Sequence, residues 1–288
     1  MPGRVGAPSR GTATPRRLRA TDLLALAGAF AGPPLPAPPA GRFARPDLPG
    51  DVRRDLDALA GPVRARVLDP LGRDAPWPAP GHPRTLTLPG APAAPARQVD
   101  ERTCGSAVLA LTRLAGDPRR ALALARWPAG AAAGFAALQR ELHARTTRGP
   151  GGLPLWPAAL GTPPWGAAAV ARYGRVRYTH RVVGGRSSRR VLAAAVAAAA
   201  AGVPVPLYTG GDLGHGVRTA VPRHVVLLAA VRDDVATVYE PSGARLHTVP
   251  VDALADPAAA GGADPRFLAA LGGWPHVVWA LLPRDAHG

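Results

Sequence analysis

Apolar residues recur at two different spacings along the chain, and the change between them divides it into two parts. From Cys104 to Leu114 they recur every three or four positions, the spacing of one face of an α-helix. Gly116-Asp117-Pro118 then ends that pattern. After Gly202 the chain shows short apolar runs bounded by turn residues, which is typical of strands. Helices followed by a sheet predict an α+β fold with two packed lobes.

The same periodicity predicts further helices on either side of the segment that begins at Cys104. Asp51 is the expected cap of one of them, Thr21 or Asp22 of another, and Ser187 or Ser188 of an alanine-rich one. Proline at position 163 or 164 suits the first turn of a helix. The expected helices span residues 20–30, 51–72, 119–126, 134–145, 163–173 and 188–202, with a helical turn at 252–255.

Alternating or continuous apolar runs predict the strands. Pro204 and Pro206 indicate that the first strand after Gly202 lies at a sheet edge, because proline donates no hydrogen bond to a central ladder. Residues 232–234 are expected to form the turn between two antiparallel strands. The expected strands span residues 175–183, 203–208, 221–231, 235–239, 245–250 and 276–282.

Proline and glycine mark the boundaries between regions. Residues 1–50 are rich in Pro, Gly, Ala and Arg, which predicts a mobile, extended arm. Residues 51–94 combine a helix, expected to pack on the main domain, with a proline-rich linker. Residues 95–283 form the expected main domain, and 284–288 a short tail.

The large positive net charge of the chain has little bearing on its expected function. The formal net charge is +16, which ordinarily points to nucleic acid or an acidic surface. However, the chain has no Lys, Asn or Ile, and its arginines are scattered, so their excess is typical of a GC-rich coding sequence. Without interleaved aromatic and basic residues or zinc-ligand spacing, we expect no nucleic-acid partner.

Cysteine usage and hydropathy bear on the compartment. The single cysteine cannot form an intramolecular disulfide, so nothing indicates an oxidising environment. The longest apolar runs are too short to span a membrane. Arg16–Arg19 before Leu23–Ala31 resembles a signal peptide, but Asp22 interrupts the apolar run. We therefore expect a cytoplasmic protein, with secretion as the alternative.

The candidate chemistry centres on Cys104, placed where a loop gives way to a helix. A helix N-terminus and a neighbouring protonated histidine both favour the reactive thiolate. Acyl transfer also requires a base, a group that orients it, and donors for the oxyanion. His224 begins an apolar strand and Glu240 ends the next one, where adjacent antiparallel strands bring side chains together. The Gln98 side chain and the Cys104 amide are the expected oxyanion donors.

These residues resemble a known family. Gln98, six residues before the Cys104-Gly105 helix start, is similar to the signature of papain-like cysteine peptidases. The segments 104–107, 223–227 and 239–243 more closely resemble the bacteriocin-processing, double-glycine-leader peptidases. The resemblance covers about residues 95–283 and implies a papain-like fold with Cys104 as nucleophile, His224 as base, Glu240 as orienting acid and Gln98 as oxyanion donor. The order Cys, His, acid also agrees.

One residue departs from the family pattern. The third member there is Asp or Asn, whereas this chain has Glu240, which is one methylene longer. The chain has no Asn, and Asp233 and Asp234 fall in the expected hairpin turn. The orienting role of Glu240 therefore depends on whether its longer side chain reaches His224 in the fold.

The expected function is thiol-dependent hydrolysis of a peptide or amide bond in a peptide or protein substrate, without metal or organic cofactor. One alternative is a non-catalytic papain-like module that binds peptides or acts as a scaffold, and another is a cysteine-dependent acyltransferase. The segment 209–216 lacks the ending of a phosphate-binding loop, and Asp212, His215 and His224 match no familiar zinc spacing. It is expected to be a loop, with His215 as a possible second base.

Overall fold

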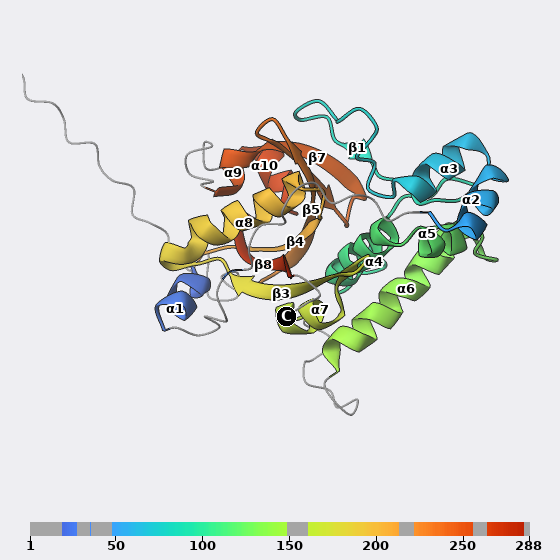
Figure 1. Cartoon of the computed structure of the whole chain (residues 1–288). Coiled ribbons are helices and arrows are strands. Elements are labelled where there is room, and N and C mark those ends of the chain that lie inside the picture. The colour runs from blue at the N-terminus through green and yellow to red at the C-terminus, as the bar shows by residue number, and fades with distance from the viewer. Residues whose placement is uncertain are drawn as a thin grey trace, which may run out of the picture.

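The computed structural model describes residues 19–27, 35, 48–148, 161–212, 222–255 and 264–284, and within them an α+β fold. Figure 1 shows a central sheet with helices against it. The helices are α1 (Ala20–Leu26), α2 (Gly50–Asp57), α3 (Gly61–Leu68), α4 (Cys104–Gly116), α5 (Pro118–Ala125), α6 (Gly130–Thr147), α7 (Pro164–Val170), α8 (Ser188–Ala200), α9 (Val251–Ala255) and α10 (Pro265–Ala270), with a 3₁₀ turn at Gly185–Ser187.

The described strands form one eight-stranded sheet in which every neighbouring pair is antiparallel. Their order across the sheet is β1-β7-β6-β5-β4-β8-β3-β2. The strands are β1 (Arg84–Thr85), β2 (Arg172–Tyr173), β3 (Val176–Val182), β4 (Val205–Gly210), β5 (His224–Arg232), β6 (Val235–Glu240), β7 (Arg245–Pro250) and β8 (His276–Arg284).

The sheet is covered by helices on both faces. Along β5, Val225 and Leu227 belong to the core that contains α4, whereas Val226 and Leu228 belong to the core that contains α8. This alternation follows from the two-residue period of a strand. In Figure 1, α8, α9 and α10 lie on one side of the sheet, and α4 to α6 on the other. The sequence predicted a helical lobe followed by a sheet lobe, but α8 and the helices after it lie on the far face of the same sheet.

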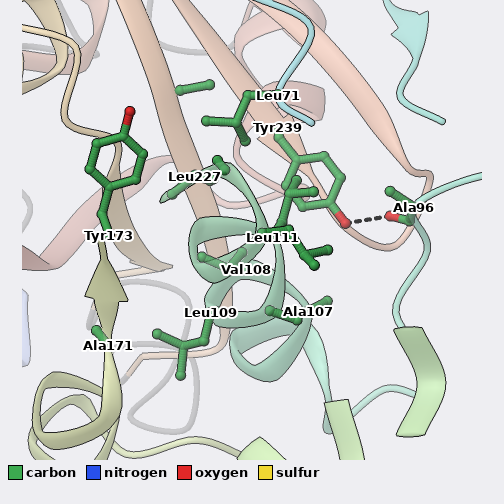
Figure 2. Packing of buried hydrophobic residues seen from close by; sticks show 14 of the residues in the cluster. Leu71, Ala96, Ala107, Val108, Leu109, Leu111, Ala171, Tyr173, Leu227 and Tyr239 are labelled. Atoms are coloured by element: carbon green, nitrogen blue, oxygen red, sulfur yellow. Dashed lines mark hydrogen bonds between the residues drawn. The ribbon is translucent and has the colours of Figure 1, made fainter. Parts of the chain in front are cut away.

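Helix α4 is the centre of the larger core. All of its residues from Cys104 to Gly116 are buried, so the helix is enclosed by the fold around its whole circumference. Figure 2 shows its residues Val108 and Leu111 beside Leu227 and Tyr239 of the sheet. The buried hydroxyl of Tyr239 donates a hydrogen bond to the Ala96 carbonyl, which ties β6 to the loop before α4. Packing of this kind fixes the position of the α4 N-terminus.

Three predictions about elements are wrong. The helix expected over residues 163–173 ends at Val170 as α7, and Arg172–Tyr173 form β2 instead. Proline explains the other two. Residues 51–72 form two helices, because Pro62 lies in the first turn of α3 and cannot continue a preceding helix. The strand at β4 lies between β5 and β8 and is not at an edge. Its pairing with β8 begins only at Leu207, so Pro206 has a register partner on β5 alone and does not interrupt the other ladder.

The expected helix caps differ from those in the structure. Helix α1 begins after Arg19, and Asp22 completes the cap from inside the first turn by accepting a hydrogen bond from the Arg19 amide at 3.0 Å. Asp51 likewise lies within the first turn of α2 rather than before it. Ser187 precedes α8, but its hydroxyl donates to the Gly184 carbonyl instead of capping the helix.

The segments before the main domain pack on it where they are described. Asp22 of α1 accepts a hydrogen bond from the Gly185 amide at 2.7 Å, within the region expected to be a mobile arm. Helices α2 and α3 pack against α5, and β1 pairs with β7. Residues 1–18 and 285–288 lie outside the described residues. Within the ranges given above, no helix is long and apolar enough to cross a membrane.

Candidate active site

Cys104 is the first residue of α4, and its side chain is buried. The residue before it, Thr103, does not cap the helix through its side chain. Its hydroxyl oxygen instead accepts hydrogen bonds from the amides of Val99 (3.1 Å) and Asp100 (3.0 Å), which closes the preceding loop into a compact turn. The amides of the first turn of α4 are therefore left without a side-chain cap, beside the thiol.

Gln139 on α6 holds the other end of this loop. Its side chain is fully buried, with Oε1 accepting from the Val99 amide at 3.0 Å and Nε2 donating to the Arg97 carbonyl at 3.0 Å. Both polar ends of the amide are thus satisfied by backbone, which fixes the chain five residues before Cys104. Sequence analysis missed Gln139, since a glutamine within a helical pattern carries no signal of its long-range partner.

His224 and Glu240 lie on neighbouring strands and form an ion pair. His224 is the first residue of β5 and Glu240 the last residue of β6. The imidazole Nε2 is 2.8 Å from Glu240 Oε1, and the two side chains are 11% and 6% exposed. Cys104 is close enough to the imidazole to contribute to the raised pKa of His224. Because Glu240 occupies Nε2, Nδ1 is the nitrogen that remains for the thiol.

The strand register explains why a glutamate reaches the histidine. Tyr239 is paired with Leu227, so continuing that register places Glu240 opposite Val226. His224 is then the diagonal neighbour on the same face of the sheet. Diagonal neighbours are about 7–8 Å apart, a distance that only long side chains span. The additional methylene of glutamate relative to aspartate therefore suits this pairing.

A tight turn after β6 holds the Glu240 carboxylate. Oε1 accepts hydrogen bonds from the Ser242 amide (2.8 Å) and hydroxyl (2.6 Å), and Oε2 accepts one from the Gly243 amide (2.8 Å). Together with His224, both oxygens are fully engaged. The contact of this turn with the carboxylate was not anticipated from the sequence.

Gly272, after α10, leaves the space that the His224 ring occupies. A Cβ atom at this glycine would overlap His224 Cδ2 and lie 2.7 Å from Nε2. The backbone there also has a φ of +68°, which favours glycine. The loop after α10 therefore encloses the His224 ring on one side. The orientation of the ring is set by this packing as well as by hydrogen bonds.

These contacts control the protonation of the pair. Burial alone lowers the pKa of His224, but hydrogen bonds with Cys104 and Glu240 outweigh burial and raise the pKa to about 9. Burial alone raises the pKa of Glu240, but hydrogen bonds from His224, Ser242 and Gly243 bring the pKa down to about 2. The imidazolium and the carboxylate are therefore both charged at neutral pH, in the arrangement that stabilises a thiolate.

Gln98 lies beside the turn that holds Glu240, and its side chain bonds to the backbone of its own loop. Its amide N–H donates to the Pro241 carbonyl at 3.0 Å, beside the Glu240 turn. The side-chain Nε2 donates to the Asp100 carbonyl at 2.9 Å, and Oε1 is buried without a hydrogen-bond partner in the described part of the chain. The structure thus brings His224 and Glu240 into contact, with Cys104 close enough to influence the pKa of His224. One of the two Nε2 protons of Gln98 bonds to the Asp100 carbonyl.

A further polar group near Cys104 was missed by sequence analysis. The Tyr208 hydroxyl is buried and, among the described residues, has no hydrogen-bond partner. Burial raises the pKa of Tyr208 well above its usual range, and the proximity of the Cys104 charge adds to this effect. An aromatic residue on an apolar strand is ordinarily expected to belong to the core, so no sequence signal distinguished Tyr208 from its neighbours.

The other candidate segment, 209–216, is described only in part. Asp212 is buried, and its Oδ2 is 3.4 Å from Nε2 of His276 at the start of β8. His215 lies outside the described residues. Nowhere in the described ranges do three His, Cys, Asp or Glu side chains group in a way that would hold a metal ion.

Comparison of the chain with protein-family models, with curated proteins and with solved structures gave no significant match. The description of the α+β architecture and of the geometry around Cys104 therefore rests on the sequence and structure of this chain.

Proposed function

We propose that the protein is a thiol-dependent hydrolase that cleaves a peptide or amide bond through Cys104, His224 and Glu240. The observation that carries this proposal is the position of the His224 imidazole, which bonds Glu240 through one nitrogen and is left with the other for Cys104. The general requirements of a nucleophile, a base and a group that orients the base are then met by adjacent residues.

The chemistry follows from this order of contacts. At neutral pH His224 already holds the proton as an imidazolium, so the Cys104 thiolate attacks the substrate carbonyl directly and gives a tetrahedral oxyanion. The uncapped amides at the α4 N-terminus supply donors for that oxygen, with the second Nε2 proton of Gln98 as a further donor. His224 then gives its proton to the leaving amine, which leaves a thioester. Water, deprotonated by His224, hydrolyses the thioester and restores the thiol.

Glu240 acts as a positioning residue in this scheme. Its carboxylate is fixed by the Ser242–Gly243 turn, so it holds the imidazole plane and stabilises the imidazolium without taking up the proton itself. The depressed pKa of Glu240, about 2, agrees with a group that stays charged throughout.

A papain-like fold is part of the proposal. It is supported by a buried helix whose first residue is the cysteine, packed against an antiparallel sheet that carries the histidine and the acid on adjacent strands. The chain order of nucleophile, histidine and acid supports it as well.

The reactivity of Cys104 tests the proposal. A thiolate paired with an imidazolium should alkylate with iodoacetamide at about pH 6–7, where an unperturbed thiol with a pKa of about 8.5 reacts slowly. The His224→Gln variant should lose this reactivity and alkylate only as the pH approaches about 8.5. Equal pH profiles for the two proteins, both like that of a model thiol, would favour the non-catalytic peptide-binding alternative.

A second measurement separates hydrolysis from acyl transfer. With the activated ester p-nitrophenyl acetate, wild-type protein should release nitrophenolate in a burst that matches the protein concentration, followed by turnover. The Cys104→Ser variant should show neither. Added amine nucleophile that diverts most of the acetyl group to amide product would indicate an acyltransferase, whereas acetate as the dominant product supports a hydrolase.

A further inference from the structure

A second group of charged side chains lies at the opposite end of α4 from Cys104. A hollow of about 410 Å³ lies where the C-terminal end of α4 meets α5, α6 and β2. Its charged lining consists of four arginines and a single carboxylate: Arg113, Arg120, Arg145, Arg172 and Asp117. We call it the arginine hollow. Arg113 is nine residues after Cys104, which corresponds to roughly 14 Å along the helix axis, so the hollow is separate from the candidate active site.

Arg113 is the unusual member of this group. Its side chain belongs to a residue that is only 8% exposed, and one guanidinium nitrogen donates to the Val170 carbonyl at 2.9 Å. Its Nε is buried and has no hydrogen-bond partner among the described residues. Burying a cation without a counter-charge is costly, so native proteins normally pair such a group.

The surrounding charges make this cost larger. Burial is the main cause that lowers the pKa of Arg113 to about 10, and the positive charges of Arg145, Arg120 and Arg172 add to it. The two carboxylates close to this group are already engaged. Asp117 pairs with Arg120 at 3.0 Å and caps α5, and Glu141 pairs with Arg145 at 3.2 Å.

Arg172 extends the positive charge beyond the hollow. Its guanidinium donates to the carbonyls of Ala169 and Ala171, at 3.1 and 2.6 Å, and to no carboxylate in the described ranges. On the sheet, Arg172 is directly opposite Arg177, and Arg177 is directly opposite Arg284. Like charges placed opposite each other on adjacent strands destabilise a sheet. The partial negative charge at the C-terminus of α4 favours one cation nearby. It does not explain why several arginines gather there.

We propose that the arginine hollow binds a phosphate-type oxyanion with two or more negative charges. Guanidinium groups bind phosphate oxygens through paired, charge-assisted hydrogen bonds, and Arg113 and Arg172 have donors that no carboxylate occupies. The anion neutralises the buried charge of Arg113 and the repulsion around Arg172 together. This binding does not depend on the chemistry of Cys104.

Thermal unfolding of the full-length protein with inorganic pyrophosphate tests the proposal. Increasing pyrophosphate should raise the unfolding midpoint by several degrees, and sodium chloride at equal ionic strength should not, because only a ligand bound to the folded state adds stability. The Arg172→Gln variant should require an about tenfold higher concentration for the same rise. Arg190→Gln on α8, which changes the net charge equally on the opposite face of the sheet, should behave like the wild type.

The Arg113→Leu variant adds an independent readout. Without pyrophosphate it should be at least as stable as the wild type, because an apolar residue replaces a buried, unpaired charge, and pyrophosphate should no longer stabilise it. If Arg113→Leu does not fold, the comparison of Arg172→Gln with Arg190→Gln still tests whether the arginine hollow binds pyrophosphate. An equal response to pyrophosphate in Arg172→Gln, Arg190→Gln and wild type would overturn the proposal. Cys104→Ser should bind pyrophosphate as the wild type does, whatever the fate of the proposed catalysis.

Discussion

Glu240 shows how one side chain can be matched to its position in a sheet. The register of β5 and β6 makes His224 its diagonal neighbour, and the turn at Ser242 and Gly243 anchors the carboxylate from the other side. A shorter acid attached to the same backbone position has to give up one of these two contacts. The length of this residue is therefore as important as its charge.

Replacement of Glu240 by Asp should weaken both the site and the protein. We expect the free energy of unfolding to fall by about 1–3 kcal/mol, because at least one hydrogen bond to a buried charged group is lost. Iodoacetamide reaction of Cys104 at about pH 6–7 should slow in parallel, since the imidazole is no longer held. Chemical unfolding and alkylation kinetics measure the two effects.

Ser242→Ala is the matched control for this substitution. It removes the hydroxyl contact at 2.6 Å but keeps the amide that also bonds Glu240 Oε1. It should therefore leave the alkylation profile near that of the wild type and reduce stability by only about 1 kcal/mol. A Glu240→Asp protein that matches the wild type in both measurements would show that side-chain length is not the deciding property.

At the scale of elements, the loop after α10 shapes the site through a pair of glycines. Gly272 and Gly273 both have positive φ values, of +68° and +87°. A Cβ at Gly272 would collide with the His224 ring, whereas a Cβ at Gly273 would meet nothing within 4 Å. Substitution of Gly273 therefore strains the backbone alone, whereas substitution of Gly272 also displaces the His224 ring.

Alanine substitutions at these two glycines should have different effects. Gly273→Ala should lower stability by about 1–2 kcal/mol, the cost of a left-handed conformation for a residue with a side chain. Gly272→Ala should lower it further, because its Cβ also collides with the His224 ring. Only Gly272→Ala should also move His224 and shift the pH dependence of Cys104 alkylation towards that of a model thiol. Identical alkylation profiles for the two variants would contradict the role assigned to Gly272.

The elements also show what a sequence can and cannot predict here. The bounds of α4 followed from local periodicity and the Gly116–Pro118 stop, because a helix depends on near neighbours. The central position of β4 did not, because strand order is set by pairing with β8, some 70 residues later along the chain. Cys104, His224 and Glu240 were proposed from residue types and resemblance. Gln139 and Gly272 could not be, since their importance lies only in what the fold brings against them.

Across the whole molecule, the candidate active site joins two parts of the chain that are distant in sequence. The first turn of α4 supplies the thiol, and the strands on which α4 packs supply the ion pair more than 100 residues later. The stability of the folded chain is therefore linked to the charges of His224 and Glu240. Burial of both groups makes this link strong.

The sign of this linkage differs for the two groups. The folded pKa of His224 is raised to about 9, so its contribution to stability is fully present below about pH 6.5 and is lost as the pH rises through 9. The folded pKa of Glu240 is lowered to about 2, so its contribution is present above about pH 4.5 and is lost as the pH falls through 2. Both contributions are complete only between about pH 4.5 and 6.5.

The Glu240→Gln variant tests this window. Gln has nearly the same shape but no charge, so it leaves the His224 imidazolium buried without its carboxylate. Between about pH 4.5 and 6.5 the variant should be less stable than the wild type by about 3 kcal/mol, the usual result of breaking a buried ion pair. The difference should narrow towards pH 3 and towards pH 9.5, while other titrating groups cancel in the comparison. Thermal or urea unfolding of both proteins across this range measures it, and a difference that stays constant with pH would show that the pair does not couple folding to protonation.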